Sequence, residues 1–397
     1  MNKAAVIHDA PGAALIGGGF IGPVHVEALR RIGVRTVGLL GSSPQRARQT
    51  AEQLAIARVY RDLEDLLQDA DVQAVHVASP NASHFHQTKA VLESGRHVIC
   101  EKPLAVSSRE TAELVGMARS RPGQVAAVNY NVRYYPLCRE IRERVLSGDL
   151  GRLLSVTGSY VQDWLLDPKD YNWRVEPGGP ANLRAVADIG THWMDLAQYI
   201  TGLPIRAVFA DLATFHPQRF RPLGPNETFL AASDKTDANL EPVTITTDDY
   251  GAVLLRFDGG ARGLYHVSQV TAGRKNRLTI ELAGSEGSAA WDSESPNQLW
   301  LGSQKGPNHL LERDPALLSP GASSITHYPG GHAEGFPDTF KQLYLDVYGA
   351  IVADRRAAKP PEFPTFADGD REVRLCEAIG RSAAAGTWVE VRDDQPA

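Results

Sequence analysis

Three glycines near the start of the sequence have the spacing that dinucleotide-binding proteins use to hold phosphate. Gly17, Gly19 and Gly22 stand in the stretch GGGFIG and match the pattern G-x-G-x-x-G. The pattern follows an apolar run at 13–17 and opens an amphipathic segment, which is the strand–turn–helix context in which it binds pyrophosphate. Glycine permits the tight turn, and a helix N-terminus supplies N–H groups and a positive dipole end. The alternative is a tight turn without a ligand; we interpret the motif as a dinucleotide site.

The residues after the second apolar run bear on which dinucleotide is bound. In LLGSSPQRAR, no Asp or Glu stands where it would accept hydrogen bonds from the ribose hydroxyls of NAD. Ser42 and Ser43 can donate hydrogen bonds there, and Arg46 can pair with a 2′-phosphate. The alternative is that Arg46 is a solvated residue of the following helix. The sequence therefore favours NADP slightly over NAD.

Polar residues also follow two later strands, at the edge of a parallel sheet where ligands bind. In ASPNASHFH, Asn81 and His84 are candidates to face the cofactor, although Asn81 could equally cap the next helix. In CEKPL, Lys102 follows the apolar run at 95–100, and Pro103 restrains the chain beyond it. The Lys102 ammonium could therefore point toward the ligand. An exposed loop lysine is the alternative.

A possible acid–base pair stands in the second half of the chain. The stretch NLRAVADIGTHWMDLAQYITG predicts an amphipathic helix with Asp188 and His192 four residues apart on one face. A histidine beside an orienting carboxylate is a base suited to taking a proton from a hydroxyl. A helix with a polar edge is the alternative. No group of Cys, His and carboxylate residues has convincing metal-ligand spacing, so we expect no metal.

The composition limits the class of partner. The 397 residues are 43% hydrophobic and 22% charged, with a net charge of −6, as in ordinary globular proteins. Without a Lys/Arg-rich block, neither nucleic acid nor an anionic membrane is an expected partner. The three cysteines lack C-x-x-C spacing, and the N-terminus does not resemble an export signal. We therefore expect a cytoplasmic protein with a small-molecule substrate.

The elements that must position these residues change in kind near residue 148. Before it, apolar strands alternate with amphipathic helices, which predicts a doubly wound parallel sheet covered on both faces. Beyond it, polar–apolar alternation with glycine turns predicts a large open, mostly antiparallel sheet, with helices near 333–353 and 368–385. The stretch 217–242 predicts a long loop. We thus divide this α/β chain into a Rossmann domain at 1–148 and an α+β substrate-binding and oligomerisation domain at 149–397.

The chain resembles the Gfo/Idh/MocA oxidoreductase family through six motifs in that family's order and spacing. They are GGGFIG, SPNASH, EKPLA, VNYNVRYYP, SGDLGRL and ADIGTHWMDLA. The likeness begins near residue 13 and covers almost the whole chain. It implies an N-terminal Rossmann domain and a C-terminal domain whose open sheet often joins subunits, here into a dimer or tetramer.

The resemblance also implies roles for single residues. Lys102, Asp188 and His192 are the implied catalytic set and touch the substrate, and Asn131 lies in the motif beside the nicotinamide. A stretch similar to that of sugar-oxidising members implies further pocket residues: Gln162, Trp164 and Arg174, with His332 or Glu334 from GGHAEGFPDTF. The residues expected to bind the cofactor are Gly17, Gly19, Phe20, Ile21, Gly22, Ser42, Ser43, Arg46, Ser79, Asn81, His84, Glu101, Lys102 and Asn131.

The expected activity is hydride transfer between a secondary hydroxyl of a sugar or polyol and NADP or NAD. His192 would take the hydroxyl proton, Lys102 would hydrogen-bond the same oxygen, and Asp188 would orient one of them. The sequence leaves open which of Lys102 and His192 takes the proton. Two alternatives share the fold: an NAD-dependent glycoside hydrolase and a non-catalytic cofactor-binding regulator. The regulator does not need the Lys–Asp–His set, and the hydrolases usually carry an export signal.

Overall fold

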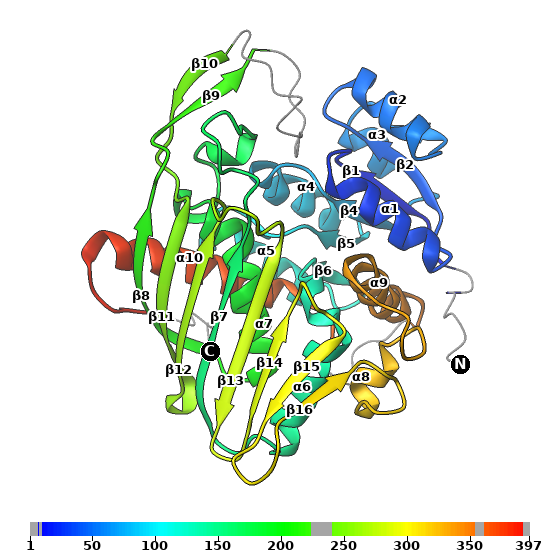
Figure 1. Ribbon diagram of the computed structural model, residues 1–397. Helices are drawn as coiled ribbons and strands as arrows, with labels where there is room; N and C mark the ends of the chain where they lie inside the picture. Colours follow the sequence, from blue (N-terminus) through cyan, green and yellow to red (C-terminus); the bar gives the residue numbers. More distant parts are fainter. Residues whose placement is uncertain (1–6, 8–9, 224–239, 354–360, 392–397) are drawn as a thin grey trace. The chain divides into compact units, whose positions relative to one another are not determined.

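The computed structural model describes residues 7, 10–223, 240–353 and 361–391 (Figure 1). The chain forms two compact units. The first unit comprises Met1–Tyr135 and Ile325–Val373, and the second comprises Pro136–Ser324 and Arg374–Ala397. A late segment of the chain therefore returns to the first unit before the chain ends in the second. The division into a Rossmann domain at 1–148 and a substrate-binding and oligomerisation domain at 149–397 stays a prediction.

The first unit is built on a six-stranded parallel sheet with the order β3-β2-β1-β4-β5-β6. Its strands are β1 (Ala13–Ile16), β2 (Thr36–Leu40), β3 (Arg58–Val59), β4 (Ala74–Val77), β5 (His97–Cys100) and β6 (Ala126–Val128). The strand order reverses between β1 and β4. In such sheets, ligands bind outside the carboxyl ends of the strands at this point. The predicted doubly wound Rossmann sheet is confirmed.

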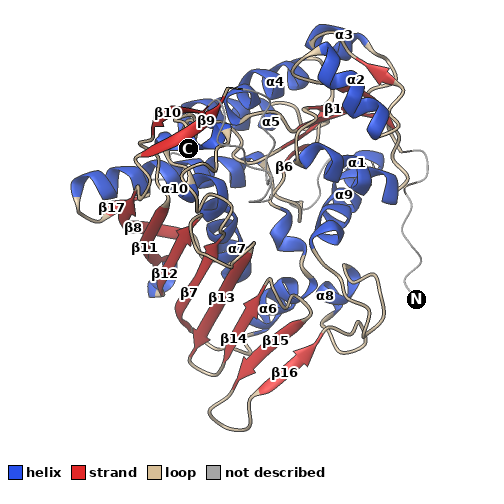
Figure 2. Ribbon diagram, turned by 45° about the horizontal axis from the view of Figure 1, so that its top comes forward, coloured by secondary structure: helices blue, strands red, loops and turns tan. Residues whose placement is uncertain are grey.

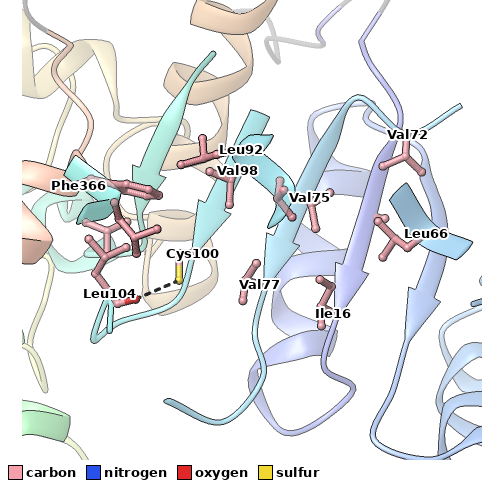
Figure 3. Packing of buried hydrophobic residues seen from close by; sticks show 14 of the residues in the cluster. Ile16, Leu66, Val72, Val75, Val77, Leu92, Val98, Cys100, Leu104 and Phe366 are labelled. Atoms are coloured by element: carbon pink, nitrogen blue, oxygen red, sulfur yellow. Dashed lines mark hydrogen bonds between the residues drawn. The ribbon is translucent and has the colours of Figure 1, made fainter. Parts of the chain in front are cut away.

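Helices cover both faces of this sheet (Figure 2). They are α1 (Ile21–Arg31), α2 (Pro44–Gln53), α3 (Leu63–Gln68), α4 (Asn81–Glu93), α5 (Ser108–Arg119), the 3-10 turn η1 (Asn131–Tyr134), α9 (Phe336–Val352) and the start of α10 (Phe366–Ala385). Successive strand residues pack to opposite faces. Ala74 and Ile99 pack with α1 and α9, whereas Val75 and Val98 pack with α3, α4, α5 and Phe366 (Figure 3). Burial on both faces explains why these strands read as unbroken apolar runs.

The second unit contains a nine-stranded sheet with the order β16-β15-β14-β13-β7-β12-β11-β8-β17. Its strands are β7 (Leu153–Val161), β8 (Ile205–Ala213), β11 (Tyr250–Phe257), β12 (Arg262–Ser268), β13 (Arg277–Gly284), β14 (Ser288–Asp292), β15 (Gln298–Gly302), β16 (His309–Glu312) and β17 (Val389–Glu390). All neighbouring pairs are antiparallel except β7 and β12, which are parallel. The expected large, mostly antiparallel sheet is confirmed.

Helices pack on one face of this sheet (Figures 1 and 2). The second unit contains α6 (Pro136–Ser147), α7 (Thr191–Thr201), α8 (Pro320–Ser324), the rest of α10, the 3-10 turns η2 (Trp173–Val175), η3 (Pro180–Asn182) and η6 (Asp258–Gly260), and the π-helical turn η4 (Val186–Gly190). Trp193 anchors α7, since its ring stacks on Tyr265 with centroids 4.6 Å apart and its Nε1 donates to the Thr279 carbonyl oxygen at 2.9 Å. Within the described residues, no helix is both long and apolar enough to cross a bilayer.

Two expectations about local structure are wrong. The stretch 217–242 is not wholly loop, because β9 (Gln218–Pro222) pairs antiparallel with β10 (Leu240–Thr244); the part at 224–239 lies outside the described residues. The buried side chain in β9 is Arg219, so the strand has no apolar alternation to reveal it. The helix expected to carry Asp188 and His192 is also not a continuous α-helix. It begins as the π-turn η4, and α7 starts only at Thr191.

Candidate active site

The three glycines of the first motif serve different purposes. Gly17 has φ +102°, and a Cβ there would lie 2.4 Å from the carbonyl oxygen of Ala78. A Cβ on Gly22 would lie 2.6 Å from the carbonyl oxygen of Gly17. Both positions therefore need glycine for the turn and its packing. At Gly19, by contrast, no described atom outside its chain neighbours lies within 4 Å of the place a Cβ would take. Gly19 thus leaves open room on the surface of the turn.

The helix that follows this turn suits an anion. Helix α1 begins at Ile21, and Phe20 before it makes no side-chain cap. The first turn reads IGPV and adds no negative charge to the positive end of the helix dipole. Together with the room at Gly19, this arrangement fits the pyrophosphate of a nicotinamide dinucleotide. Gly17, Gly19, Phe20, Ile21 and Gly22 are all in this strand–turn–helix, as the sequence predicts.

The end of β2 contains polar residues but no carboxylate. The Ser43 hydroxyl caps α2 by accepting the Arg46 N–H at 3.4 Å, and Ser42 is exposed beside it. The Arg46 guanidinium is exposed, and no described residue forms an ion pair with it. The side chain of Arg46 is therefore available to a ligand phosphate near the carboxyl end of β2.

His84 joins the loops that follow β4 and β5. Its ring is buried, with Nδ1 2.7 Å from the Pro103 carbonyl oxygen and Nε2 2.8 Å from that of Ser79. Burial lowers the pKa of His84, against the effect of these two carbonyl contacts. Asn81 is the first residue of α4, and Pro80 occupies the N-cap position, so Asn81 is not the cap. His84 thus fixes the backbone around the predicted site, and its contact with a cofactor stays a prediction.

Glu101 is a buried carboxylate next to Lys102 in the chain. Its Oε2 accepts the backbone N–H of Lys102 at 3.2 Å, and its Oε1 accepts hydrogen bonds from His25 and Asn129. Burial by itself would raise the pKa of Glu101, but the hydrogen bond and electrostatic interaction with His25, the charge of Lys102 and the hydrogen bond from Asn129 bring it down to about 2. Asn131, two residues after Asn129, is also buried, and its Nδ2 donates to the Thr339 hydroxyl of α9 at 2.7 Å. Glu101 is therefore an anion that supports the Lys102 loop from inside the first unit.

In the second unit, polar residues lie together at one end of three central strands of the nine-stranded sheet. The parallel pairing of β7 with β12, and the antiparallel pairing of β13 with β7, bring Gln162, Gln269 and Asn276 to the same end of three neighbouring strands. Asn276 Oδ1 accepts from Gln162 Nε2 and from the Tyr160 hydroxyl, each at 2.8 Å. Trp164 Nε1 donates to Gln162 Oε1 at 2.8 Å. Gln162 and Trp164, both predicted pocket residues, are thus held together.

Asp188 lies in η4 and is held from two directions. Gln269 Nε2 donates to Asp188 Oδ2 at 2.9 Å, and Arg174 Nε lies 3.5 Å from Oδ1. The start of η4 is fixed by Asp248, whose carboxylate accepts the N–H groups of Arg184 at 2.6 Å and Val186 at 2.9 Å. π-Helical turns recur at functional sites. The second unit therefore presents a half-buried, oriented carboxylate.

His192 follows in the first turn of α7 and is half-buried, with its ring centroid 6.3 Å from that of Tyr160. His192, Asp188, Arg174, Gln162 and Trp164 all belong to the second unit, whereas Lys102 and the residues expected to bind the cofactor belong to the first. The catalytic roles of these residues stay predictions. Among the described residues, no group of three or more His, Cys, Asp and Glu side chains could hold a metal ion.

Comparison with known families identifies both parts of the chain. Residues 12–130 match the oxidoreductase family's NAD-binding Rossmann fold, and residues 138–290 match the GFO/IDH/MocA C-terminal domain. The chain belongs to the Gfo/Idh/MocA oxidoreductase family. This confirms the resemblance in the sequence motifs and makes the first unit an NAD-binding Rossmann unit.

Relatives within the Gfo/Idh/MocA family cover almost the whole chain. Levoglucosan dehydrogenase of Pseudarthrobacter phenanthrenivorans is 29% identical over 393 residues, which is 95% of this chain and 97% of that protein. An oxidoreductase domain protein from Kribbella flavida has a TM-score of 0.85 and 31% identity, covering 97% of this chain and 100% of that one. An inositol dehydrogenase homolog from Azotobacter vinelandii, solved with NADH and myo-inositol, has a TM-score of 0.83 and 29% identity, covering 98% and 100%. These relatives include a sugar dehydrogenase and a cyclitol dehydrogenase homolog.

Some residues of this Gfo/Idh/MocA protein's site were not anticipated from the sequence. Gln269 and Asn276 were missed because each stands in a polar turn at a strand end, and only the strand order brings them to Asp188 and Gln162. For His332 or Glu334, contact with the pocket stays a prediction. Glu334 Oε1 accepts the N–H groups of His327 and Tyr328 at 2.5 Å each.

Proposed function

We propose that this protein is an NAD(P)-dependent dehydrogenase that oxidises a secondary hydroxyl of a sugar or cyclitol. The observation that carries the proposal is the turn at Gly17–Gly22, in which Gly17 and Gly22 are needed for packing and Gly19 leaves open room at an uncapped helix N-terminus. Membership of an oxidoreductase family and relatives named as sugar or cyclitol dehydrogenases support the substrate class.

The catalytic set in this proposal is Lys102, Asp188 and His192. When bound, the nicotinamide supplies the carbon that accepts or releases the hydride. His192 takes the proton from the substrate hydroxyl, a task for which histidine suits because its unperturbed pKa, about 6.5, is near neutral pH. Lys102 donates a hydrogen bond to the same oxygen and stabilises its developing negative charge. Asp188, oriented by Gln269 and Arg174, holds the acid–base group in place.

The polar surroundings follow from the same assignment. Gln162, Trp164 and Arg174 bind the hydroxyl groups and the ring of the substrate. Side-chain amides, an indole N–H and a guanidinium are donors that suit a polyhydroxylated ligand. The hydrogen bonds of Gln162 to Trp164 and Asn276 limit its rotation, which lowers the entropy lost when substrate binds.

The finer cofactor assignment is a preference for NADP. The loop after β2 carries no carboxylate that would repel a 2′-phosphate, and the Arg46 guanidinium is exposed without an ion pair among the described residues. Ser42 and Ser43 add hydroxyl donors. The Azotobacter vinelandii relative was solved with NADH, so this preference would distinguish the present protein from that relative.

The outer face of the nine-stranded sheet supports a homo-oligomer. A row of cross-strand neighbours on this face runs through Leu254 and Leu264, then the polar Thr157 and Glu281, then Ala290, Trp300 and Leu310. Leu254, Leu264 and Leu310 are 42%, 46% and 57% exposed. Large apolar side chains gathered on one face are typical of association surfaces. We assign this face to contact between copies of the chain.

The experiment that tests the proposed function follows the absorbance of reduced nicotinamide while sugars and cyclitols are offered with NAD and NADP in parallel. One substrate class should raise the absorbance, faster with NADP. Cofactor binding without a rise for any substrate would contradict the dehydrogenase assignment. Cleavage of a glycoside without net reduction would establish the hydrolase alternative, and tight cofactor binding without either reaction would establish the regulator.

A further inference from the structure

A chain of buried polar side chains leads from the Lys102 loop into the core of the first unit. Glu101 Oε1 lies 3.0 Å from His25 Nε2, and His25 Nδ1 lies 2.9 Å from His76 Nδ1. His76 Nε2 lies 2.9 Å from the Tyr348 hydroxyl, and the Tyr344 hydroxyl lies 2.7 Å from His25 Nδ1. Neither histidine exposes any surface. Such a chain in an otherwise apolar core costs desolvation unless its hydrogen bonds serve a purpose.

The chain joins elements that are far apart in the sequence. His25 comes from α1, which begins at the dinucleotide turn, and His76 comes from the centre of β4. Tyr344 and Tyr348 come from α9, one helical turn apart. The aromatic rings also pack on one another, with His76 and Tyr344 in edge-to-face contact at 4.8 Å between centroids. The position of His25 is therefore fixed from three sides before it reaches Glu101.

The charge of Glu101 sets the direction of the hydrogen bond that it makes with His25. The low pKa of Glu101, about 2, leaves its carboxylate ionised and able only to accept. His25 must then donate from Nε2. Its Nδ1 lies within hydrogen-bond distance of both His76 Nδ1 and the Tyr344 hydroxyl, so these two groups hold the other side of the ring. Burial supports this arrangement, because it lowers the pKa of His76 and raises those of Tyr344 and Tyr348.

We propose that His25 is a positioning residue that holds Glu101 as an oriented anion behind Lys102, with His76 and Tyr344 fixing the His25 ring. The inference rests on the proposed function, in which Lys102 contacts the substrate oxygen. Glu101 touches the Lys102 loop through the backbone N–H, and its charge interacts with the Lys102 ammonium. A carboxylate that cannot rotate keeps that ammonium correctly placed.

The first test reads the tautomers directly and does not depend on activity. In ¹⁵N spectra of protein labelled in histidine, His25 should carry a proton on Nε2. Assignment uses the single variants His25→Gln and His76→Gln. Absence of a proton from His25 Nε2 would overturn the proposal even if the protein proves to be a dehydrogenase. A proton on His25 Nε2 in a protein without dehydrogenase activity would instead retain the hydrogen bond to Glu101 while the proposed function fails.

The second test compares two substitutions at His25. In His25→Gln, the amide can still donate to Glu101, whereas His25→Leu removes the donor. His25→Leu should lower kcat/KM by roughly 10- to 100-fold and move its pH profile, while His25→Gln should stay within about threefold of the parent. The groups facing Glu101 that could shape this profile are Lys102, His25, Tyr344, His84 and Cys100.

Controls separate positioning from packing. His97 lies on the neighbouring strand β5, where its Nδ1 accepts the Val125 N–H at 3.0 Å, so His97→Gln should leave the pH profile unchanged. Cofactor affinity and the melting temperature of each variant show whether it folds. Equal losses in His25→Gln and His25→Leu, with an unmoved pH profile, would reduce His25 to a packing residue and overturn the proposal.

Discussion

Gln269 Nε2 lies 2.9 Å from Asp188 Oδ2, and this hydrogen bond joins the end of β12 to the π-turn η4. Because the carboxylate only accepts, the amide of Gln269 must present its nitrogen to Asp188. The contact gives Asp188 one defined orientation. Gln269 is fully buried, so water cannot readily replace it as a donor.

Replacing Gln269 with Leu should therefore impair turnover more than cofactor binding. A hydrogen bond to a charged group is worth roughly 1.5–3 kcal/mol, which corresponds to a decrease in kcat of roughly 10- to 100-fold if the bond supports the transition state. The matched control is Gln298→Leu on β15, an exposed glutamine bonded to Glu312 at 2.7 Å. Steady-state kinetics with equal kcat in both variants would remove Gln269 from the site.

His192→Ala tests the acid–base assignment. Loss of a positioned general base should lower kcat by roughly 10²–10⁴-fold and leave the dissociation constant of the cofactor unchanged. His309→Ala on β16, an exposed histidine of the same unit, serves as the control. Undiminished kcat in His192→Ala would move the proton-transfer role to Lys102.

Arg46→Ala tests the preference for NADP. The substitution removes a cation from the end of β2. The KM of the variant for NADP should therefore rise, while its KM for NAD stays constant. Arg48→Ala, in the same helix and also exposed, is the control for a general loss of positive charge. If Arg46→Ala changes the two cofactors equally, Arg46 does not contact a 2′-phosphate.

Stability should fall as pH rises through the titration of Asp248. Burial raises the pKa of Asp248 to about 6, although backbone N–H groups of Arg184 and Val186 oppose the shift. The pKa of Asp248 in the folded chain exceeds the unfolded value of about 4, so protonation of Asp248 stabilises the folded state. This contribution is fully present below about pH 4 and is lost as pH rises through about 6. The loss is on the order of 2–3 kcal/mol.

Urea unfolding of the parent and of Asp248→Asn across this pH range measures that effect. The parent should lose stability relative to Asp248→Asn as pH rises, because the amide does not titrate. Asp211→Asn, at an exposed position on β8, should instead follow the parent. Parallel curves for the parent and Asp248→Asn would show that Asp248 titrates alike in the folded and unfolded chain.

The outer face of the nine-stranded sheet is the surface through which we expect copies of the chain to associate. Leu254 and Leu264 are cross-strand partners on β11 and β12 and are both exposed. Changing both to Glu should break an assembly formed through this face, because it places like charges on opposing surfaces. Light scattering should then show a smaller mass for the double variant than for the parent. An unchanged mass would place the subunit contact elsewhere.

Hydrophobic periodicity is enough to predict the Rossmann sheet and most of the second sheet, because each strand carries its burial pattern in its own residues. Elements held by polar contacts escape this reasoning. Buried Arg219 anchors β9 by donating to the Leu165 carbonyl oxygen and to Asp249, and backbone contacts made by Asp248 fix the start of η4. Short elements such as β3 and α3, of two and six residues, are below the length at which a period appears.

The residues of the candidate site also differ in whether local sequence is enough to predict them. The glycine turn and Lys102 can be predicted because each comes just after an apolar strand. Gln269 and His25 acquire their roles only through partners distant in sequence, 81 residues away for Asp188 and 76 for Glu101. A histidine in the centre of a buried strand, as at His76, is a usable signal, since a buried imidazole needs a hydrogen-bond partner.

The proposed reaction moves a hydride from a secondary alcohol carbon to a nicotinamide. The most direct measurement uses the substrate found by the absorbance assay, deuterated at the oxidised carbon, and mass spectrometry of the recovered cofactor. The reduced cofactor should carry the deuterium, and His192→Ala should slow this transfer without weakening cofactor binding. Reduced cofactor without the label, or a cleaved glycoside with the cofactor still oxidised, would contradict the proposed reaction.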